Sequence, residues 1–147
     1  MNILVTGASG QLGSTLKAIA HSAPDLNFFF KSSKELDITD YQAIQTELLT
    51  YDYAYCINCA AYTHVDNAES ATELAKRINV TGARNLALNC QAQKTVLIHI
   101  STDFVFDGNL SEPYREEAIA RAIGCYGDTK YKGEQAIINT LKEYFII

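Results

Sequence analysis

The stretch Asn2-Ile-Leu-Val-Thr-Gly-Ala-Ser-Gly-Gln-Leu-Gly13 decides the fold of this chain. Residues 2–6 form a short apolar run with several β-branched residues, which predicts a strand. Gly7, Gly10 and Gly13 follow with the spacing G-x-x-G-x-x-G, and apolar residues then recur at helical spacing. A glycine-rich turn between a first strand and a first helix indicates a dinucleotide-binding α/β domain.

Each glycine of this turn has its own expected task. Gly7 permits a tight turn, Gly10 lets the backbone approach a pyrophosphate, and Gly13 lets the helix pack closely on the strand. The free N–H groups at the helix start supply partial positive charge. A purely structural turn is the alternative, but the position directly after the first strand favours dinucleotide binding.

Strands and helices alternate along the rest of the chain. Further strands are predicted at residues 26–30, 53–58 and 95–100, with another beginning at 145–147. Further helices are predicted at residues 41–50, 71–92 and 125–144, the first of them capped by Thr39 or Asp40. This order predicts an α/β fold, a doubly wound parallel sheet of the Rossmann type with helices on both faces. We expect residues 1–147 to form one NAD(P)-binding Rossmann domain.

Length and composition narrow the class of protein. The 147 residues are 48% hydrophobic and 20% charged, which suits one folded domain. The net charge of −5 disfavours nucleic acid and anionic membrane surfaces as partners. No apolar run approaches the roughly 18 residues of a membrane span, and the first residues do not resemble a signal peptide. We therefore expect a cytoplasmic protein.

The cysteines are expected to be free thiols. Cys56 and Cys59 form a C-x-x-C, which can mark a redox or metal pair. Here the motif lies in a predicted strand, where residues three apart point to opposite faces. We therefore interpret both as small buried apolar residues, and we expect the isolated Cys90 and Cys125 to be reduced.

Thr102, Tyr126 and Lys130 form the candidate catalytic set. Tyr126 and Lys130 are four residues apart at a predicted helix start, so they share a face. Thr102 ends a predicted strand, where ligand sites of α/β proteins lie. A tyrosine can act as a general acid when a neighbouring ammonium favours its phenolate. The Y-x-x-x-K pattern occurs by chance in many helices, and the glycine turn gives it weight. His99, inside an apolar strand, is interpreted as a core residue.

Several longer strings carry a family resemblance. They are Glu35-Leu-Asp-Ile-Thr-Asp40, Asn58-Cys-Ala-Ala-Tyr-Thr-His-Val-Asp-Asn-Ala-Glu69, Asn79-Val-Thr-Gly82, Ser101-Thr-Asp-Phe-Val-Phe-Asp-Gly108 and Tyr126-Gly-Asp-Thr-Lys130. With the glycine turn, they make the chain resemble the extended short-chain dehydrogenase/reductases, most closely their dTDP-4-dehydrorhamnose reductase branch. The resemblance implies an oxidoreductase that uses NADPH or NADH to reduce a 4-keto sugar nucleotide in deoxysugar (rhamnose) biosynthesis.

The resemblance also assigns roles to individual residues. The cofactor would be bound by Gly7, Gly10, Gln11, Leu12, Gly13, Asp37, Ile38, Ala60, Ala61, Tyr62, Asn79, Tyr126 and Lys130. Asn79 would help to place Lys130, and Lys130 would hold the nicotinamide ribose. Thr102 would bond the reacting oxygen while Tyr126 protonates it. Val65 and Asp103, with Thr102, would lie near the sugar. The resemblance admits a homodimer, and Ser14 and Thr15 stand where relatives carry an acidic metal ligand, so no metal is expected.

Coenzyme choice and two departures leave alternatives open. Lys31-Ser32-Ser33-Lys34 follows the second strand without an acidic residue, which favours NADPH or no preference, unless it is a solvated loop. Ala122 and Gly124 replace a proline and an asparagine that precede the tyrosine in the family, which loosens that loop. Family members are about twice as long, so the C-terminal substrate domain is expected to be missing.

Two other functions are compatible with these features. One is a non-catalytic regulatory subunit of the methionine adenosyltransferase type, and the other is a nucleotide-sugar epimerase or dehydratase. The retained Thr102, Tyr126 and Lys130 favour an enzyme over a regulator. The string of residues 101–108 favours a reductase by resemblance.

Overall fold

One parallel sheet organises the computed structural model, which describes all 147 residues. Its strands are β1 (Asn2–Thr6), β2 (Asn27–Lys31), β3 (Tyr53–Asn58), β4 (Val96–His99) and β5 (Tyr144–Ile146). They lie in the order β2-β1-β3-β4-β5, and every pair is parallel. The order reverses direction between β1 and β3. Ligands of such sheets bind at this reversal, beyond the carboxyl ends of the strands.

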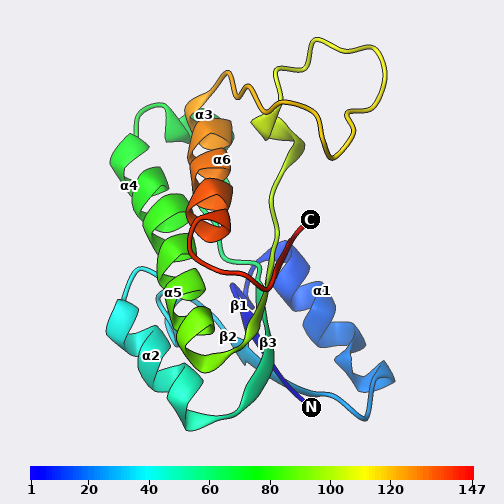
Figure 1. Ribbon diagram of the computed structural model, residues 1–147, viewed down its shortest axis with the longest axis vertical. Helices are drawn as coiled ribbons and strands as arrows, with labels where there is room; N and C mark the ends of the chain where they lie inside the picture. Colours follow the sequence, from blue (N-terminus) through cyan, green and yellow to red (C-terminus); the bar gives the residue numbers. More distant parts are fainter.

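The helices cover both faces of the sheet, as the sequence predicts. They are α1 (Gln11–Ile19), α2 (Tyr41–Thr50), α3 (Val65–Ala68), α4 (Thr72–Lys76), α5 (Ala83–Gln93) and α6 (Cys125–Ile138), with short turns η1 (Ala20–Ser22) and η3 (Asp103–Val105). Figure 1 shows α1 on one side of the strands and α2, α5 and α6 on the other. The doubly wound Rossmann arrangement is therefore confirmed.

Most predicted boundaries agree with the structure. The strands at 2–6 and 53–58 and the helix at 41–50 have the predicted bounds. Asp40 caps that helix by accepting the N–H groups of Gln42 and Ala43 at 2.9 and 3.1 Å. β2 is shifted by one residue, and β4 is two residues shorter than predicted.

Two predicted helices need correction. The helix predicted at 71–92 is one helical run, but a π-helical segment, η2 (Arg77–Gly82), divides it into α4 and α5. The helix predicted at 125–144 ends at Ile138, because the N–H of Thr140 turns back to the carbonyl of Ile137 and the chain leaves the helix. This early end frees Tyr144 to pair with Leu97 of β4, and it starts β5 one residue early.

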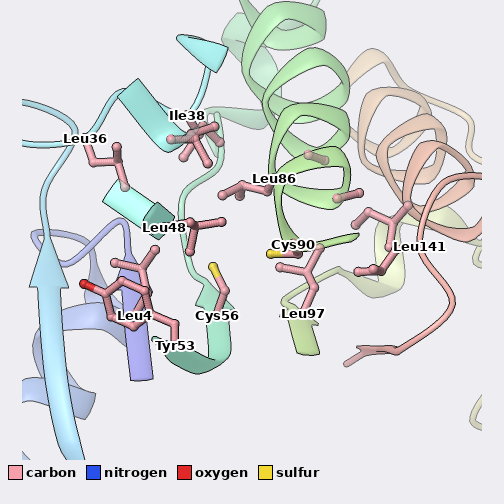
Figure 2. Close-up of a cluster of buried hydrophobic side chains, with 14 residues drawn as sticks. Leu4, Leu36, Ile38, Leu48, Tyr53, Cys56, Leu86, Cys90, Leu97 and Leu141 are labelled. Atoms are coloured by element: carbon pink, nitrogen blue, oxygen red, sulfur yellow. The ribbon is translucent and has the colours of Figure 1, made fainter. Parts of the chain in front are cut away.

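The main core lies between the sheet and the helices α2 and α5. Leu4, Cys56 and Leu97 are adjacent across β1, β3 and β4, and all three are fully buried. Ile44 of α2 and Leu86 of α5 belong to the same buried cluster. Figure 2 shows Leu48 of α2 and Leu86 of α5 beside the strand residues. Burying such a side chain stabilises the fold by about 1.5–3 kcal/mol. This core fixes the positions of the strand ends, where the polar residues of the site begin.

All four cysteines are free thiols. The sulfurs of Cys56 and Cys90 face each other in the core (Figure 2). Contact with Cys90 and burial raise the pKa of the Cys56 thiol, and burial raises the pKa of Cys59 to about 11. Both thiols therefore stay protonated at neutral pH. Cys56 is buried in β3 as predicted, whereas Cys59 follows the strand and is only half-buried, so the prediction that both are buried strand residues is wrong for Cys59. None of the helices has the length and apolarity that a membrane span needs.

Candidate functional site

The turn after β1 is built by close backbone contacts. Gly7 has a φ of +66°, and a Cβ on it would lie 2.5 Å from the backbone nitrogen of Ala60. The N–H of Gly10 donates to the carbonyl of Gly7 at 3.0 Å. Gly10 precedes α1 and offers no side-chain cap, so the first N–H groups of α1 are left for a ligand. The geometry is that of an anion-binding helix start.

Two cavities lie along this turn and share Gly10, Cys59 and Ala61. The smaller, of about 270 Å³, is lined also by Gly7, Ser33, Asp37, Ile38 and Ala60. The larger, of about 440 Å³, is lined also by Gln11, Leu12, Ile100, Ser101, Tyr126 and Lys130. The shared residues make them one elongated groove. We call it the nucleotide groove.

Lys130 lies at one end of the nucleotide groove and is only 1% exposed. Its Nζ donates to the carbonyl of Ile100 at 2.6 Å and lies 3.4 Å from Nε2 of His99. Burial lowers the pKa of this lysine to about 8, against the opposing influence of the Glu134 carboxylate. Glu134 in turn accepts a hydrogen bond from the hydroxyl of Ser101.

Tyr126 borders two cavities. It is the second residue of α6, is 8% exposed, and packs edge to face against Phe104 with ring centroids 5.6 Å apart. Tyr126 lines the nucleotide groove, and it also lines a third cavity of about 450 Å³. A proton on its hydroxyl could therefore be delivered to a molecule that spans both spaces.

The third cavity, which we call the loop cavity, is mostly apolar. Its lining includes Val65, Asp103, Phe104, Phe106, Asp107, Tyr114, Ile123 and Tyr126. The hydroxyl of Tyr114 donates to Asp107 at 2.5 Å, and this bond holds the pKa of Asp107 below its ordinary value. In Figure 1 the loop between η3 and α6, yellow to orange, extends away from the sheet. Val65 and Asp103, the predicted sugar contacts, both line this cavity.

Thr102 and Asn79 are placed differently from the others. The Thr102 hydroxyl accepts the N–H of Phe104 at 3.2 Å and so caps η3, and Thr102 is not among the residues that line these cavities. Asn79 bonds the backbone N–H of Tyr62 at 2.8 Å and the hydroxyl of Thr129 at 3.0 Å. It thus links the loop after β3 to α6 next to Lys130, rather than bonding Lys130.

Sequence reasoning gave no role in the site to three residues that support it, although the prediction that one of them, His99, is a core residue is confirmed. Asn58 and His99 are buried polar residues that connect β3 and β4 to Lys130. Glu69 accepts the N–H of Cys125 at 2.7 Å and caps α6. A polar residue at the end of an apolar strand was the available signal for the first two. The third contact joins residues 56 positions apart, which no local pattern reveals.

Comparisons with known proteins agree with this geometry. The model of the family described as RmlD substrate binding domain matches residues 1–147. A dTDP-4-dehydrorhamnose reductase of Streptomyces griseus is 40% identical over 95% of this chain and 46% of its own length. A dTDP-4-keto-6-deoxy-D-glucose reductase of Streptomyces niveus is 38% identical, over 95% of this chain and 48% of its own.

A solved structure is similar over the same extent. The dTDP-4-dehydrorhamnose reductase of Bacillus anthracis, in complex with NADP, superposes with a TM-score of 0.94 at 39% identity. The match covers 99% of this chain and 51% of that one. The chain thus spans about half the length of the relatives it matches.

Proposed function

Because the chain belongs to the RmlD substrate binding domain family, we propose that it serves NAD(P)H-dependent reduction of a 4-keto sugar nucleotide, as a reductase of the dTDP-4-dehydrorhamnose type. The observation that carries the proposal is the position of Tyr126. This residue borders the nucleotide groove and the loop cavity, with Lys130 beside it in the groove. A hydride donor and a keto sugar in these two spaces would meet at the tyrosine.

The nucleotide groove suits a dinucleotide. It is elongated, and it passes over the glycine turn, where a Cβ on Gly7 would collide with the backbone of Ala60. Asp37 and Ile38 at one end would meet the adenine half. The uncapped start of α1 would hold the pyrophosphate, and Lys130 at the other end would bind the nicotinamide ribose.

The chain's own residues supply positioning and a proton. The bound cofactor supplies the hydride. Ala61 and Leu12 would orient the cofactor along the groove, and Val65 and Asp103 would hold the sugar in the loop cavity. Tyr126 would donate its hydroxyl proton to the sugar oxygen as it becomes an alkoxide. The role of Thr102 toward that oxygen stays a prediction. Its hydroxyl accepts the N–H of Phe104 and donates to Asp103 at 3.3 Å, so its proton would have to turn from Asp103 to the substrate.

NADPH is the proposed coenzyme. The similar structure from Bacillus anthracis holds NADP. At the end of β2, Lys31 pairs with Glu47 at 3.0 Å, whereas Lys34, in the segment after the strand, has no ion-pair partner. Ser33 lines the groove next to Asp37. A serine hydroxyl in the lining of the groove, followed in sequence by a lysine without an ion-pair partner, suits a 2′-phosphate.

The test pairs coenzyme binding with turnover. NADPH and NADH are titrated separately, and loss of reduced-coenzyme absorbance is then followed with a dTDP-4-keto-6-deoxy sugar. Tyr126→Phe should bind NADPH normally and lose turnover by at least about 100-fold. Tyr131→Phe, on the same helix but in neither cavity, is the matched control and should keep both.

Each failure has a distinct meaning. Absence of NADPH and NADH binding would overturn the assignment of the nucleotide groove. Binding without turnover in the unaltered chain would favour either a non-catalytic nucleotide-binding role or a reductase that needs the half of the relatives' length that this chain does not span. Equal loss of turnover in Tyr126→Phe and Tyr131→Phe would contradict the assignment of Tyr126 as the proton donor.

The setting of the protein is part of the same proposal. We infer a cytoplasmic location, which the four free thiols support. Self-association as a homodimer stays a prediction, and sedimentation of the purified chain would test it.

A further inference from the structure

Four buried polar side chains form a row beneath the nucleotide groove. Thr6, Asn58 and His99 are adjacent in register at the carboxyl ends of β1, β3 and β4, and Lys130 of α6 completes the row. Their exposed fractions are between 0 and 2%. The Thr6 hydroxyl lies 2.7 Å from Oδ1 of Asn58, and Nδ2 of Asn58 lies 2.9 Å from Nδ1 of His99. A buried row of this kind is costly unless every donor meets an acceptor.

One backbone group sets the direction of every hydrogen bond in the row. The N–H of Ala60 lies 3.1 Å from the Asn58 side chain, and a backbone N–H can only donate. Oδ1 of Asn58 must therefore face Ala60, where it also accepts from the rotatable hydroxyl of Thr6. The amide nitrogen of Asn58 must then face His99. Flipping the amide would set two donors, Nδ2 and the Ala60 N–H, against each other.

This direction assigns the proton on His99. Nδ1 accepts from Asn58, so the neutral ring carries its single proton on Nε2. Nε2 lies 3.4 Å from Nζ of Lys130, which donates elsewhere to the carbonyl of Ile100. The positive end of the Nε2–H dipole thus points at the lysine nitrogen. An ammonium is disfavoured there, while a neutral amine would accept the Nε2–H.

We propose that the Ala60 amide and Asn58 lock His99 as its Nε2–H tautomer, and that the locked ring weakens the hold of Lys130 on its proton. His99 is then a positioning residue, which acts through Lys130. The proposal deepens the proposed function and rests on it only for the use of that lysine in catalysis. Ala60 also lines the adenosine end of the groove. The hydrogen bonds of the row therefore run from Ala60, at the adenosine end of the groove, to the amino group of Lys130 at the other end.

The other ionisable groups around Lys130 act in known directions. Glu134, one turn along α6, favours the ammonium. Tyr126 and Cys59 line the groove beside the lysine, and the raised pKa of Cys59 keeps that thiol neutral. Burial and the charge of Lys130 hold the pKa of His99 at about 3, so the ring is neutral at every pH where the protein would work. The His99 dipole and burial thus oppose Glu134.

Nuclear magnetic resonance of the imidazole nitrogens reads the tautomer directly. The chain has three histidines, and the signals of His99 are those missing from His99→Gln. Without any coenzyme, the unaltered chain labelled in its histidine nitrogens should show a protonated Nε2 and an unprotonated Nδ1 near neutral pH. Protonated Nδ1 in the unaltered chain would overturn the proposal.

Two variants test what locks the ring. Asn58→Asp places a carboxylate that accepts from Ala60 and demands a proton on Nδ1, so it should move the His99 proton to Nδ1 or add a second one. The titration midpoint of Lys130, followed at its Nζ and assigned by Lys130→Met, should change with it. Thr6→Val, the matched control, removes only the hydroxyl at the far end and should leave the His99 tautomer as it is.

These outcomes are independent of the reductase proposal. If Asn58→Asp does not fold, the tautomer of the unaltered chain and of Thr6→Val still decides. An unchanged His99 spectrum in a folded Asn58→Asp would overturn the lock, whatever the coenzyme titration shows. Loss of NADPH binding with the predicted spectra would instead overturn the proposed function and leave the lock in place.

Discussion

Gly7 and Gly108 share one backbone conformation in two different surroundings. Their φ angles are +66° and +69°, a region that favours glycine. Gly7 lies in the turn of the nucleotide groove, where a Cβ would come within 2.5 Å of the Ala60 nitrogen. Gly108 lies in the loop after η3, where a Cβ would have no neighbour within 4 Å. One glycine is required by packing and conformation, the other by conformation alone.

The same difference separates the two halves of the candidate site. The nucleotide groove is walled by strand ends and by backbone, above a row of fully buried polar side chains. The loop cavity is walled by side chains of a long segment that exposes Phe104, Ile119 and Ile123 at 50, 76 and 86%. The groove is therefore set by the fold itself. The loop cavity depends on a few contacts that order the loop.

The largest expected difference is between Gly7→Ala and Gly108→Ala. Gly7→Ala adds a methyl group to a backbone contact that cannot yield, so it should cost more than about 4 kcal/mol and abolish NADPH binding. Gly108→Ala should cost only the left-handed backbone penalty, about 1–2 kcal/mol, and leave NADPH binding intact. Urea unfolding and coenzyme titration measure both.

Either of two results would break this comparison. Equal destabilisation by the two substitutions would mean that conformation, not packing against Ala60, explains Gly7. Normal NADPH affinity in a folded Gly7→Ala would mean that the turn does not need its close approach to Ala60.

Acid stability gives the second contrast, between His99 and Asp107. The folded pKa of His99 is lowered from 6.5 to about 3 by burial and Lys130. Below pH 6.5 the unfolded chain binds a proton on His99 that the folded chain does not bind. The free energy of unfolding therefore decreases as pH falls. From pH 6.5 to about 4 this amounts to roughly 3 kcal/mol, at about 1.4 kcal/mol per pKa unit. Asp107 is only partly buried, and its lowered pKa rests mainly on the hydrogen bond from the hydroxyl of Tyr114.

Urea midpoints measured at steps across this pH range separate the two groups. The loss of stability between pH 6.5 and about 4 should shrink in His99→Gln and stay almost unchanged in Asp107→Asn. The slope with pH is the readout, because His99→Gln also lowers stability at every pH. A slope that is the same in His99→Gln and in the unaltered chain would show that His99 takes up its proton in the folded state.

Local patterns explain why so much of the fold was predictable. β1, β3 and α2 are each defined by residues adjacent in sequence, namely a β-branched run, an apolar run before Asn58, and Asp40 as a cap. The end of α6 was missed because pairing of Tyr144 with Leu97 of β4 competes with continued helix. The π-helical segment was missed because hydrophobic spacing does not distinguish it from α-helix.

The candidate site divides in the same way. The glycine turn, Tyr126 and Lys130 belong to short spacings that the sequence displays, and the structure brings all three to one groove. The roles of Asn58 and His99 could not be predicted, because their hydrogen-bond partners lie 41 and 31 residues away, in a neighbouring strand and in α6. The sequence shows a polar residue in an apolar strand, but which group satisfies it depends on sheet register.

The smallest expected effect concerns the start of α6, where the groove and the loop meet. Gly124 has no side chain to cap the helix, so the Glu69 carboxylate takes the Cys125 N–H at 2.7 Å. Glu69→Gln keeps an acceptor but removes a negative charge from a helix start, and should cost about 0.3–1 kcal/mol, less at high salt. Glu73→Gln, which loses only an exposed pair with Lys76, is the matched control. If Glu69 also positions Tyr126 for catalysis, Glu69→Gln should lower turnover more than it lowers NADPH affinity. Glu73→Gln should change neither quantity. Equal effects of the two substitutions would mean that Glu69 contributes only a surface charge and does not position Tyr126.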